Sequence, residues 1–231
     1  MVSRPMNAIV KLLIIGDVLT FSGFGFISPI FAVFIKDDLK GGSLAAVGIA
    51  SMIYLVTKAI LQIPIAHWTD KEPANVREFW TGIIGYGLVA LIPFLYLLID
   101  TVEQLYWVQV LYGVAAALAY PGWMAIFTKF ADHEKAASSW SVYSTSTIMG
   151  MAVTAALGGW LGQTYGFSTL LILVGIFTFL GFFVTAGLAL FYDQLKAIHP
   201  EHLTSLGERV RHALRLHKHP IVPPGKIDGI K

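Results

Sequence analysis

The chain has 231 residues, of which 56% are hydrophobic and only 13% are charged, and its mean hydropathy is +0.69. A soluble domain carries about 25% charged residues, so this composition excludes a water-soluble globule and predicts a membrane protein. The formal net charge is +2 and cysteine is absent, which excludes a disulfide framework and thiolate chemistry.

The first apolar segment, residues 8–35, continues past Asp17 and is too long for the core of a signal peptide. It therefore predicts a membrane span. A helix needs about 20 mostly apolar residues to cross a bilayer, and six segments meet this length. They cover residues 8–35, 43–66, 79–99, 105–127, 140–161 and 168–192. Strands of a membrane barrel would give alternating segments of about ten residues, so we expect an all-α bundle over residues 1–192.

The connections between these spans alternate in charge. Basic residues gather near the N-terminus and at every second connection, as at Lys71, Arg77 and Lys129. On the opposite face, Lys36 and Lys40 are offset by two aspartates, and the other loops there carry no Lys or Arg. By the positive-inside rule, both termini are expected in the cytoplasm, and we expect a bacterial inner membrane protein.

The composition changes after residue 192. Residues 193–219 place leucine and valine at helical spacing between several Arg and Lys, which predicts a basic amphipathic helix on the inner leaflet. Residues 220–231 are rich in Pro and Gly and are expected to form a disordered tail. Five histidines lie in this region, but no cysteine or carboxylate spacing accompanies them, so we predict neither a metal site nor a cofactor.

Asp17 and Lys58 are charged residues inside predicted spans. Such charges cost about 2.5–3.5 kcal/mol each and are rare without a role. Each lies nine residues from the cytoplasmic end of its span, at a depth of about 14 Å, so we expect the two side chains to pair. The pair is either a proton-coupling or substrate-charge site, or a fixed contact that orients two helices.

The fifth predicted span has a small residue at every fourth position, which lets a neighbouring helix approach closely. This helix-packing stripe consists of Ser146, Gly150, Thr154, Gly158 and Gly162.

Several motifs resemble the N-terminal six-helix half of the major facilitator superfamily. After the second span, residues 62–71 resemble its loop signature G-x-x-x-D-[RK]-x-G-[RK], with Asp70 and Lys71 matching and Arg77 placed to supply the later basic charge. Ala66 replaces the first glycine of that signature. Asn7, Gly23, Pro29 and Tyr120-Pro121-Gly122 resemble the opening of the first span and the fourth span. Residues 150–159 resemble a fifth-span motif of drug/proton antiporters, but Thr154-Ala155 replaces its Gly-Pro.

The resemblance implies two inverted three-helix repeats and secondary transport of a small solute by alternating access. Asp70 would then belong to a gating loop that meets a helix terminus of a second half. Spans one and four would line the cavity, with Gln109, Tyr112, Tyr120 and Trp123 as candidate contacts, although such aromatic side chains also serve as packing or interface anchors.

Spans two and five would face the other half of the transporter. We therefore expect a homodimer formed through the stripe, a separate second half, or a fragment of a longer transporter. A six-span membrane protein without transport activity is the alternative. An intramembrane protease is not supported, because His67 and His133 lie at span ends and no G-x-S-x-G occurs. No enzyme activity and no nucleic-acid partner are expected.

Overall fold

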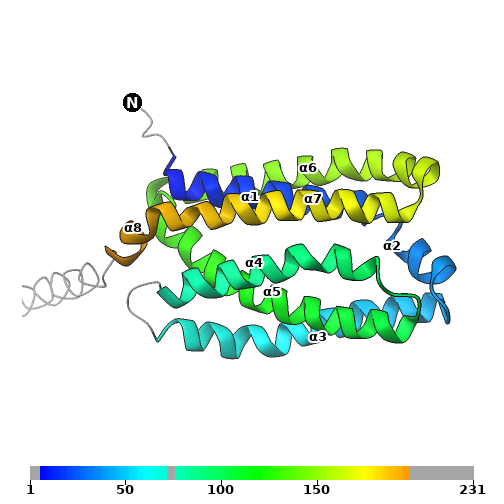
Figure 1. Ribbon diagram of the computed structural model, residues 1–231. Coiled ribbons are helices and arrows are strands. Elements are labelled where there is room, and N and C mark those ends of the chain that lie inside the picture. Colours follow the sequence, from blue (N-terminus) through cyan, green and yellow to red (C-terminus); the bar gives the residue numbers. More distant parts are fainter. Residues whose placement is uncertain (1–5, 72–75, 198–231) are drawn as a thin grey trace, which may run out of the picture. The chain divides into compact units, whose positions relative to one another are not determined.

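The computed structural model describes residues 6–71 and 76–197, and apart from one isolated backbone bridge, between Lys40 and Thr101, the regular structure in these ranges is helical (Figure 1). The long helices are α1 (Ala8–Ile27), α3 (Leu44–Thr69), α4 (Val76–Tyr96), α5 (Val102–Phe130), α6 (Ala136–Tyr165) and α7 (Phe167–Ala186). Short helical segments join them: α2 (Phe31–Val33), η1 (Phe34–Asp38), η2 (His133–Lys135), η3 (Gly187–Phe191) and α8 (Tyr192–Ala197).

Five segments of the described chain are long and apolar enough to cross a membrane: α1, α3, α4, α5 and Phe167–Leu195. These segments confirm an all-α membrane protein. Helix α6 has 30 residues, which is also long enough for a crossing. Its first half carries seven Ser or Thr residues between positions 138 and 147, which lower its hydropathy.

The first span ends earlier than predicted. Helix α1 stops at Ile27, whereas the apolar pattern predicted a segment continuing to residue 35. Proline has no backbone N–H and so cannot continue the helical hydrogen bonds, which accounts for the end of α1 just before Pro29. The chain then turns into α2 and the π-helical segment η1, which carries Lys36, Asp37 and Asp38.

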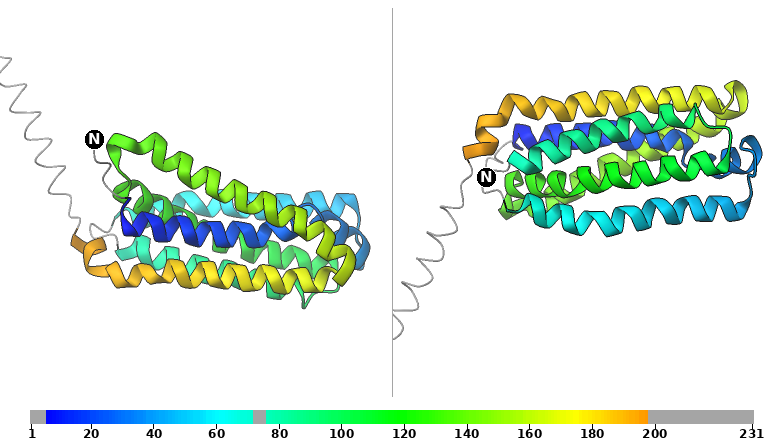
Figure 2. Two further views of the ribbon diagram at one scale, coloured as in Figure 1. Left: turned by 90° about the horizontal axis from the view of Figure 1, so that it is seen from above. Right: turned by 60° about the horizontal axis from the view of Figure 1, so that its bottom comes forward.

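The long helices pack in two groups, α1 with α6 and α7, and α5 with α3 and α4. Figures 1 and 2 show these groups as neighbouring layers of nearly parallel rods. Contact between α4 and α7 joins them. The first three long helices (α1, α3, α4) and the last three (α5, α6, α7) pack in the same pattern. Helix α1 packs on α6 and α7, and helix α5 packs in the same way on α3 and α4.

The apolar core consists of two clusters, one toward each end of the bundle. One includes Phe26, Ile92 and Leu170, and the other includes Leu13 and Phe127. Along α1, the stretch between these clusters holds the buried Asp17, Thr20 and Ser22. The fold thus leaves a polar layer between two apolar layers.

The predicted amphipathic helix over residues 193–219 and the tail over 220–231 lie outside the described residues, apart from the part of the former that belongs to α8.

Candidate functional site

The Asp17 carboxylate is the most deeply buried charged group that the sequence singled out, with 3% of the residue exposed. Tyr86 of α4 donates a hydrogen bond to its Oδ1 atom. Tyr143 of α6 donates one to its Oδ2 atom at 2.9 Å. Each carboxylate oxygen therefore has a hydroxyl donor, and a single side chain ties α1 to two other helices.

Polar side chains continue from this carboxylate toward α3. The phenol of Tyr143 lies close enough to Tyr120 of α5 for an electrostatic interaction. The ammonium group of Lys58 lies 4.9 Å from the centre of the Tyr120 ring, a cation–π contact. Tyr120 is 41% exposed, so the series leads from a buried carboxylate to an accessible face. We call Asp17, Tyr143, Tyr120 and Lys58 the tyrosine path.

The predicted ion pair between Asp17 and Lys58 is wrong. The carboxylate contacts two tyrosines and the ammonium group contacts the Tyr120 ring. The prediction assumed that consecutive spans are neighbours, but α1 packs on α6 and α7, while α3 packs on α5. The two charges can share a depth in the membrane without meeting.

The other candidates of the fourth span serve in packing. Gln109 is buried with its side chain next to Tyr96. Tyr112 stacks between Phe24 and Tyr54, at ring distances of 5.4 and 4.4 Å. Tyr120, in contrast, lines an open groove.

Trp123 is buried and packs against Tyr143, with ring centres 4.8 Å apart and ring planes inclined by 42°. It therefore packs against a member of the tyrosine path and does not face the groove.

A groove of about 550 Å³ lies between α3 and α5. Its polar lining side chains are Gln62, His67, Asp70, Tyr120, Thr128 and Lys129. The groove joins two features that the sequence analysis treated separately, because it contains both the gating-loop aspartate and the exposed member of the tyrosine path.

The gating-loop residues lie where α3 ends. Asp70 caps this helix, and its backbone N–H donates to the Ala66 carbonyl at 3.0 Å. The Arg77 guanidinium donates to the Trp68 carbonyl at 3.1 Å and lies over the Trp68 ring. Lys71 is exposed. Arg77 thus ties the start of α4 to the end of α3.

The sequence analysis missed three residues of this region. Tyr86 and Tyr143 hold the central carboxylate, and Glu78 is buried at the start of α4, where its Oε1 atom lies 3.3 Å from Lys129 Nζ. Tyr86 lies between two glycines inside an apolar segment, so it was visible as an exception to the pattern, whereas Glu78 follows Arg77 just before that segment and gave no such signal.

The packing stripe of α6 lies against α1 of the same chain. A side-chain carbon at Gly150 would meet Ser22, and one at Gly158 would meet the Phe26 backbone. The Thr154 hydroxyl lies against Gly25. The stripe therefore acts in helix packing, as expected, but it is occupied, so the inference that it forms the contact with a second copy is wrong.

Comparison with known proteins identifies the family. The sequence model of the Major Facilitator Superfamily matches residues 13–222. Two curated relatives are the multi-drug resistance efflux pump PmrA of Streptococcus pneumoniae strains TIGR4 and R6, each 25% identical over 175 residues. The match covers 74% of this chain and 42% of the relative, so the chain spans less than half the length of these pumps. Since the family match extends over most of the sequence, the chain belongs to the Major Facilitator Superfamily.

Proposed function

We propose that this chain forms a six-span half of a secondary transporter that carries a small solute by alternating access. Family membership supports transport. The first three and the last three long helices pack in the same pattern. This supports two inverted three-helix repeats, the arrangement on which alternating access depends. Helix α6 supplies the remaining crossing, its hydroxyl groups facing the transport pathway or bonding back to the helix.

The observation that carries this proposal is the connection between the groove and the tyrosine path. A solute in the groove would meet the Tyr120 ring, against which the Lys58 ammonium group lies, and Tyr143 interacts with both Tyr120 and the buried Asp17. A charge at membrane depth is costly unless it pairs or faces water. Lys58 lies on a groove-forming helix, so we assign it to solute contact and Asp17 to charge coupling.

The second half is expected against α3 and α6. Only 11% of the α3 window that qualifies as a span is buried within the chain, and α6 exposes a row of apolar side chains such as Val153 and Leu157. A second copy of the chain, or a separate six-helix half, would cover both helices and close the groove. Asp70 would then face a helix terminus of that half.

The name of the curated relatives supplies the first solutes to test. They are multi-drug efflux pumps, and a groove that combines the Tyr120 ring and aliphatic side chains with the charged groups of Asp70 and Lys129 suits amphipathic, drug-like molecules. We therefore propose export of such compounds from the cytoplasm of a bacterial cell, with both termini inside.

The water accessibility of Tyr120 tests the proposal whatever the identity of the solute. The chain has no cysteine, so Tyr120→Cys introduces a single thiol in the groove. We expect a membrane-impermeant thiol reagent to label it, and an added drug-like solute to slow that labelling. Leu180→Cys, at a 49% exposed position on α7, is the matched control and should face lipid and stay unlabelled.

Failure of Tyr120→Cys to react from either side of the membrane would contradict a transport cavity at this place and favour a non-transporting membrane protein. The role of Asp17 is tested separately by accumulation of fluorescent drugs in cells that express the chain. Asp17→Asn should abolish export, while Asp100→Asn, in an exposed loop, should retain it.

A further inference from the structure

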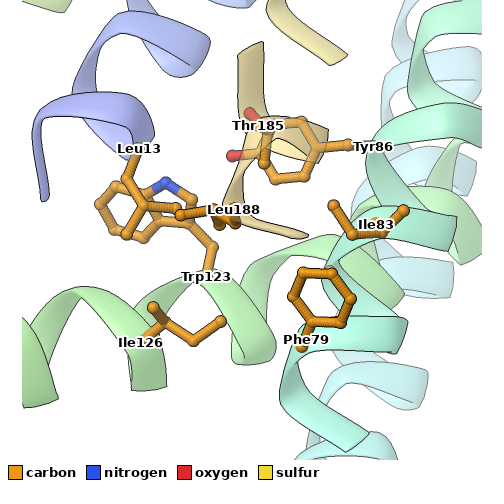
Figure 3. A pocket seen from close by; sticks show the side chains of 9 residues that line it. Leu13, Phe79, Ile83, Tyr86, Trp123, Ile126, Thr185 and Leu188 are labelled. Atoms are coloured by element: carbon orange, nitrogen blue, oxygen red, sulfur yellow. The ribbon is translucent and has the colours of Figure 1, made fainter. Parts of the chain in front are cut away.

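A small cavity adjoins the buried carboxylate on the side of the gating loops. It is lined by residues of α1, α4, α5, α7 and η3, among them Leu13, Tyr86, Trp123 and Thr185 (Figure 3). The centre of a water molecule has about 10 Å³ available there, which is the space that one bound water needs. The question is whether this space is dry or hydrated.

Two polar atoms at this cavity have no hydrogen-bond partner among the described residues. They are the indole Nε1 of Trp123 and the hydroxyl oxygen of Thr185. Both residues are more than nine-tenths buried, at 4% and 3% exposure. Buried polar groups without partners are rare in native proteins, because desolvation is not offset by a new bond.

A third polar group reaches the same space. Figure 3 shows the Tyr86 hydroxyl directed toward the region where the Trp123 nitrogen and the Thr185 hydroxyl lie. Tyr86 donates its only hydroxyl hydrogen to Asp17, so its oxygen still has room to accept a bond. One donor and two acceptors therefore lie at the edge of a space of the size of one water, whose remaining lining is apolar.

The donor and acceptor count fits a water molecule. Its oxygen would accept from the Trp123 N–H, and its two hydrogens would go to the oxygens of Tyr86 and Thr185. This makes three bonds, the usual number for a buried water. An apolar cavity of the same size would stay empty, but the three polar groups favour hydration here.

We propose that this cavity is a binding site for a single water molecule, which bridges Trp123, Tyr86 and Thr185 and holds the Tyr86 hydroxyl in position to donate to Asp17. The site makes Trp123 and Thr185 positioning residues for the carboxylate, although neither touches it. The proposal does not depend on Asp17 taking part in transport.

Gly82 provides a direct test of this water. It lines the cavity, and a side-chain carbon built at this position would meet nothing within 4 Å. Gly82→Ala therefore places a methyl group into the space that the water would occupy. Gly48→Ala is the matched control, because it adds the same methyl group to helix α3 at an exposed position that is equally free of contacts.

The hydrogen bonding of Trp123 is read from the indole N–H band in ultraviolet resonance Raman spectra of the purified full chain. The difference between each protein and the same protein with Trp123→Phe isolates this one indole. We expect a hydrogen-bonded N–H in the wild type, a free N–H in Gly82→Ala, and a bonded N–H in Thr185→Val, which removes only one of the three partners of the water.

A free N–H in the wild type, or a bonded one in Gly82→Ala, would overturn the proposal. Loss of the bond in Thr185→Val but not in Gly82→Ala would indicate direct contact between Trp123 and Thr185 and would overturn it as well.

The melting temperature of Gly82→Ala gives an independent test, because it should change in opposite directions for a dry and for a hydrated cavity. Alanine is the better helix former, so filling a dry cavity should raise the melting temperature relative to the wild type. Expelling a water that satisfies three groups should instead lower it by about 2–4 °C or more, while Gly48→Ala leaves it unchanged or raised. A raised melting temperature for Gly82→Ala would contradict the water site.

Discussion

The Asp17 carboxylate is held by two tyrosine hydroxyls and not by a cation. Hydrogen bonds to a charged group are stronger than neutral ones, and removal of a donor leaves the buried acceptor unsatisfied. Tyr86 and Tyr143 differ in one respect that matters here, because Tyr86 is buried whereas Tyr143 is half-buried and nearer to water. The two hydrogen bonds should therefore contribute unequally to stability.

We predict that Tyr86→Phe lowers the free energy of unfolding by about 1–2 kcal/mol and that Tyr143→Phe lowers it by less. Water can replace the lost Tyr143 hydroxyl more easily. Denaturant unfolding of the purified chain measures both, with Tyr165→Phe at an exposed position as the control. In an Asp17→Asn background the cost of Tyr86→Phe should shrink, and an unchanged cost would show that the hydroxyl acts elsewhere.

A second buried carboxylate, that of Glu78, lies near the gating loop. Its Oε1 atom is 3.3 Å from Lys129 Nζ, and only 2% of its side chain is exposed, against 39% for Lys129. Removing the cation from a buried pair leaves an uncompensated charge, which costs more than replacing both partners.

We predict that Lys129→Met destabilises the chain by about 1–3 kcal/mol, reduced from the full burial cost because water reaches the lysine side. The double change Lys129→Met with Glu78→Gln should recover most of that loss. Thermal unfolding of the single and double variants checks this. A double variant less stable than the single one would mean that the Glu78 charge has another essential partner.

At the scale of single elements, the contact between α1 and α6 depends on glycine. A side-chain carbon at Gly158 would clash with the backbone of Phe26, whereas one at Gly150 would clash with the movable Ser22 hydroxyl and make ordinary contact with its other neighbours. Gly159, the next residue on α6, has nothing within 4 Å. Gly158 therefore permits the close approach of two helices, whereas Gly159 does not. Comparing the two positions distinguishes the effect of close approach from the effect of helix propensity.

We predict that Gly158→Ala sharply reduces the yield of folded protein, because the α1 and α6 backbones must separate. Gly159→Ala should be neutral or slightly stabilising, since alanine favours the helix by about 1 kcal/mol. Size-exclusion chromatography and melting curves of the two variants provide the comparison. Equal yields would show that α6 does not approach α1 this closely.

The positions of the helices along the chain were more predictable than the contacts between them. Apolar length placed every long helix, although α3 runs to Thr69 and α5 to Phe130, three residues beyond the predicted ends at 66 and 127. Apolar patterns follow the membrane, whereas helices end at their own caps. The end of α1 was missed because its apolar run continues after Pro29.

The candidate site could be predicted only in part for a related reason. Asp17 and Lys58 stood out because charges inside spans are conspicuous. Their partners were not predictable, because the order of spans along the chain does not give their order in space. Helix α1 meets α6 and α7, whose sequences lie more than a hundred residues away. Tyr86 and Tyr143 became visible only once these contacts were known.

At the scale of the molecule, one end of the bundle gathers the connections that carry few basic residues. The Lys40 N–H donates to the Asp100 carbonyl at 2.9 Å, and the Val102 N–H donates back to the Lys40 carbonyl. The connections at residues 39–43 and 98–101 therefore meet at one end. Lys71, Arg77 and Lys129 belong to connections at the other end.

We predict that reporters fused at Asp100 and after the last residue lie on opposite sides of the membrane, with the C-terminal reporter in the cytoplasm. A phosphatase reporter, active only outside, paired with a fluorescent reporter, active only inside, measures this. Replacing Lys71 and Arg77 by glutamine should weaken the asymmetry and produce mixed insertion. An external C-terminal reporter in the wild type would contradict the proposed orientation.

The last prediction concerns the surface that meets the second half. The stripe of α6 is taken by α1, so we expect that half to contact the exposed faces of α3 and α6. Met52 and Leu157 represent these faces, at 56% and 46% exposure. Met52 lies eight residues after Leu44, and Leu157 lies eight residues before Tyr165, so both are about 12 Å from the same end of the bundle. A two-fold axis along the membrane normal would bring α3 of one copy to α6 of the other at equal depth.

Chains with Met52→Cys and Leu157→Cys, co-expressed in native membranes, should therefore form a mixed disulfide dimer, whereas Leu180→Cys on α7 should not join with either. Equal capture by Leu180→Cys would indicate random collision, and no capture in any combination would rule out the homodimer and leave a separate six-helix half as the partner to seek.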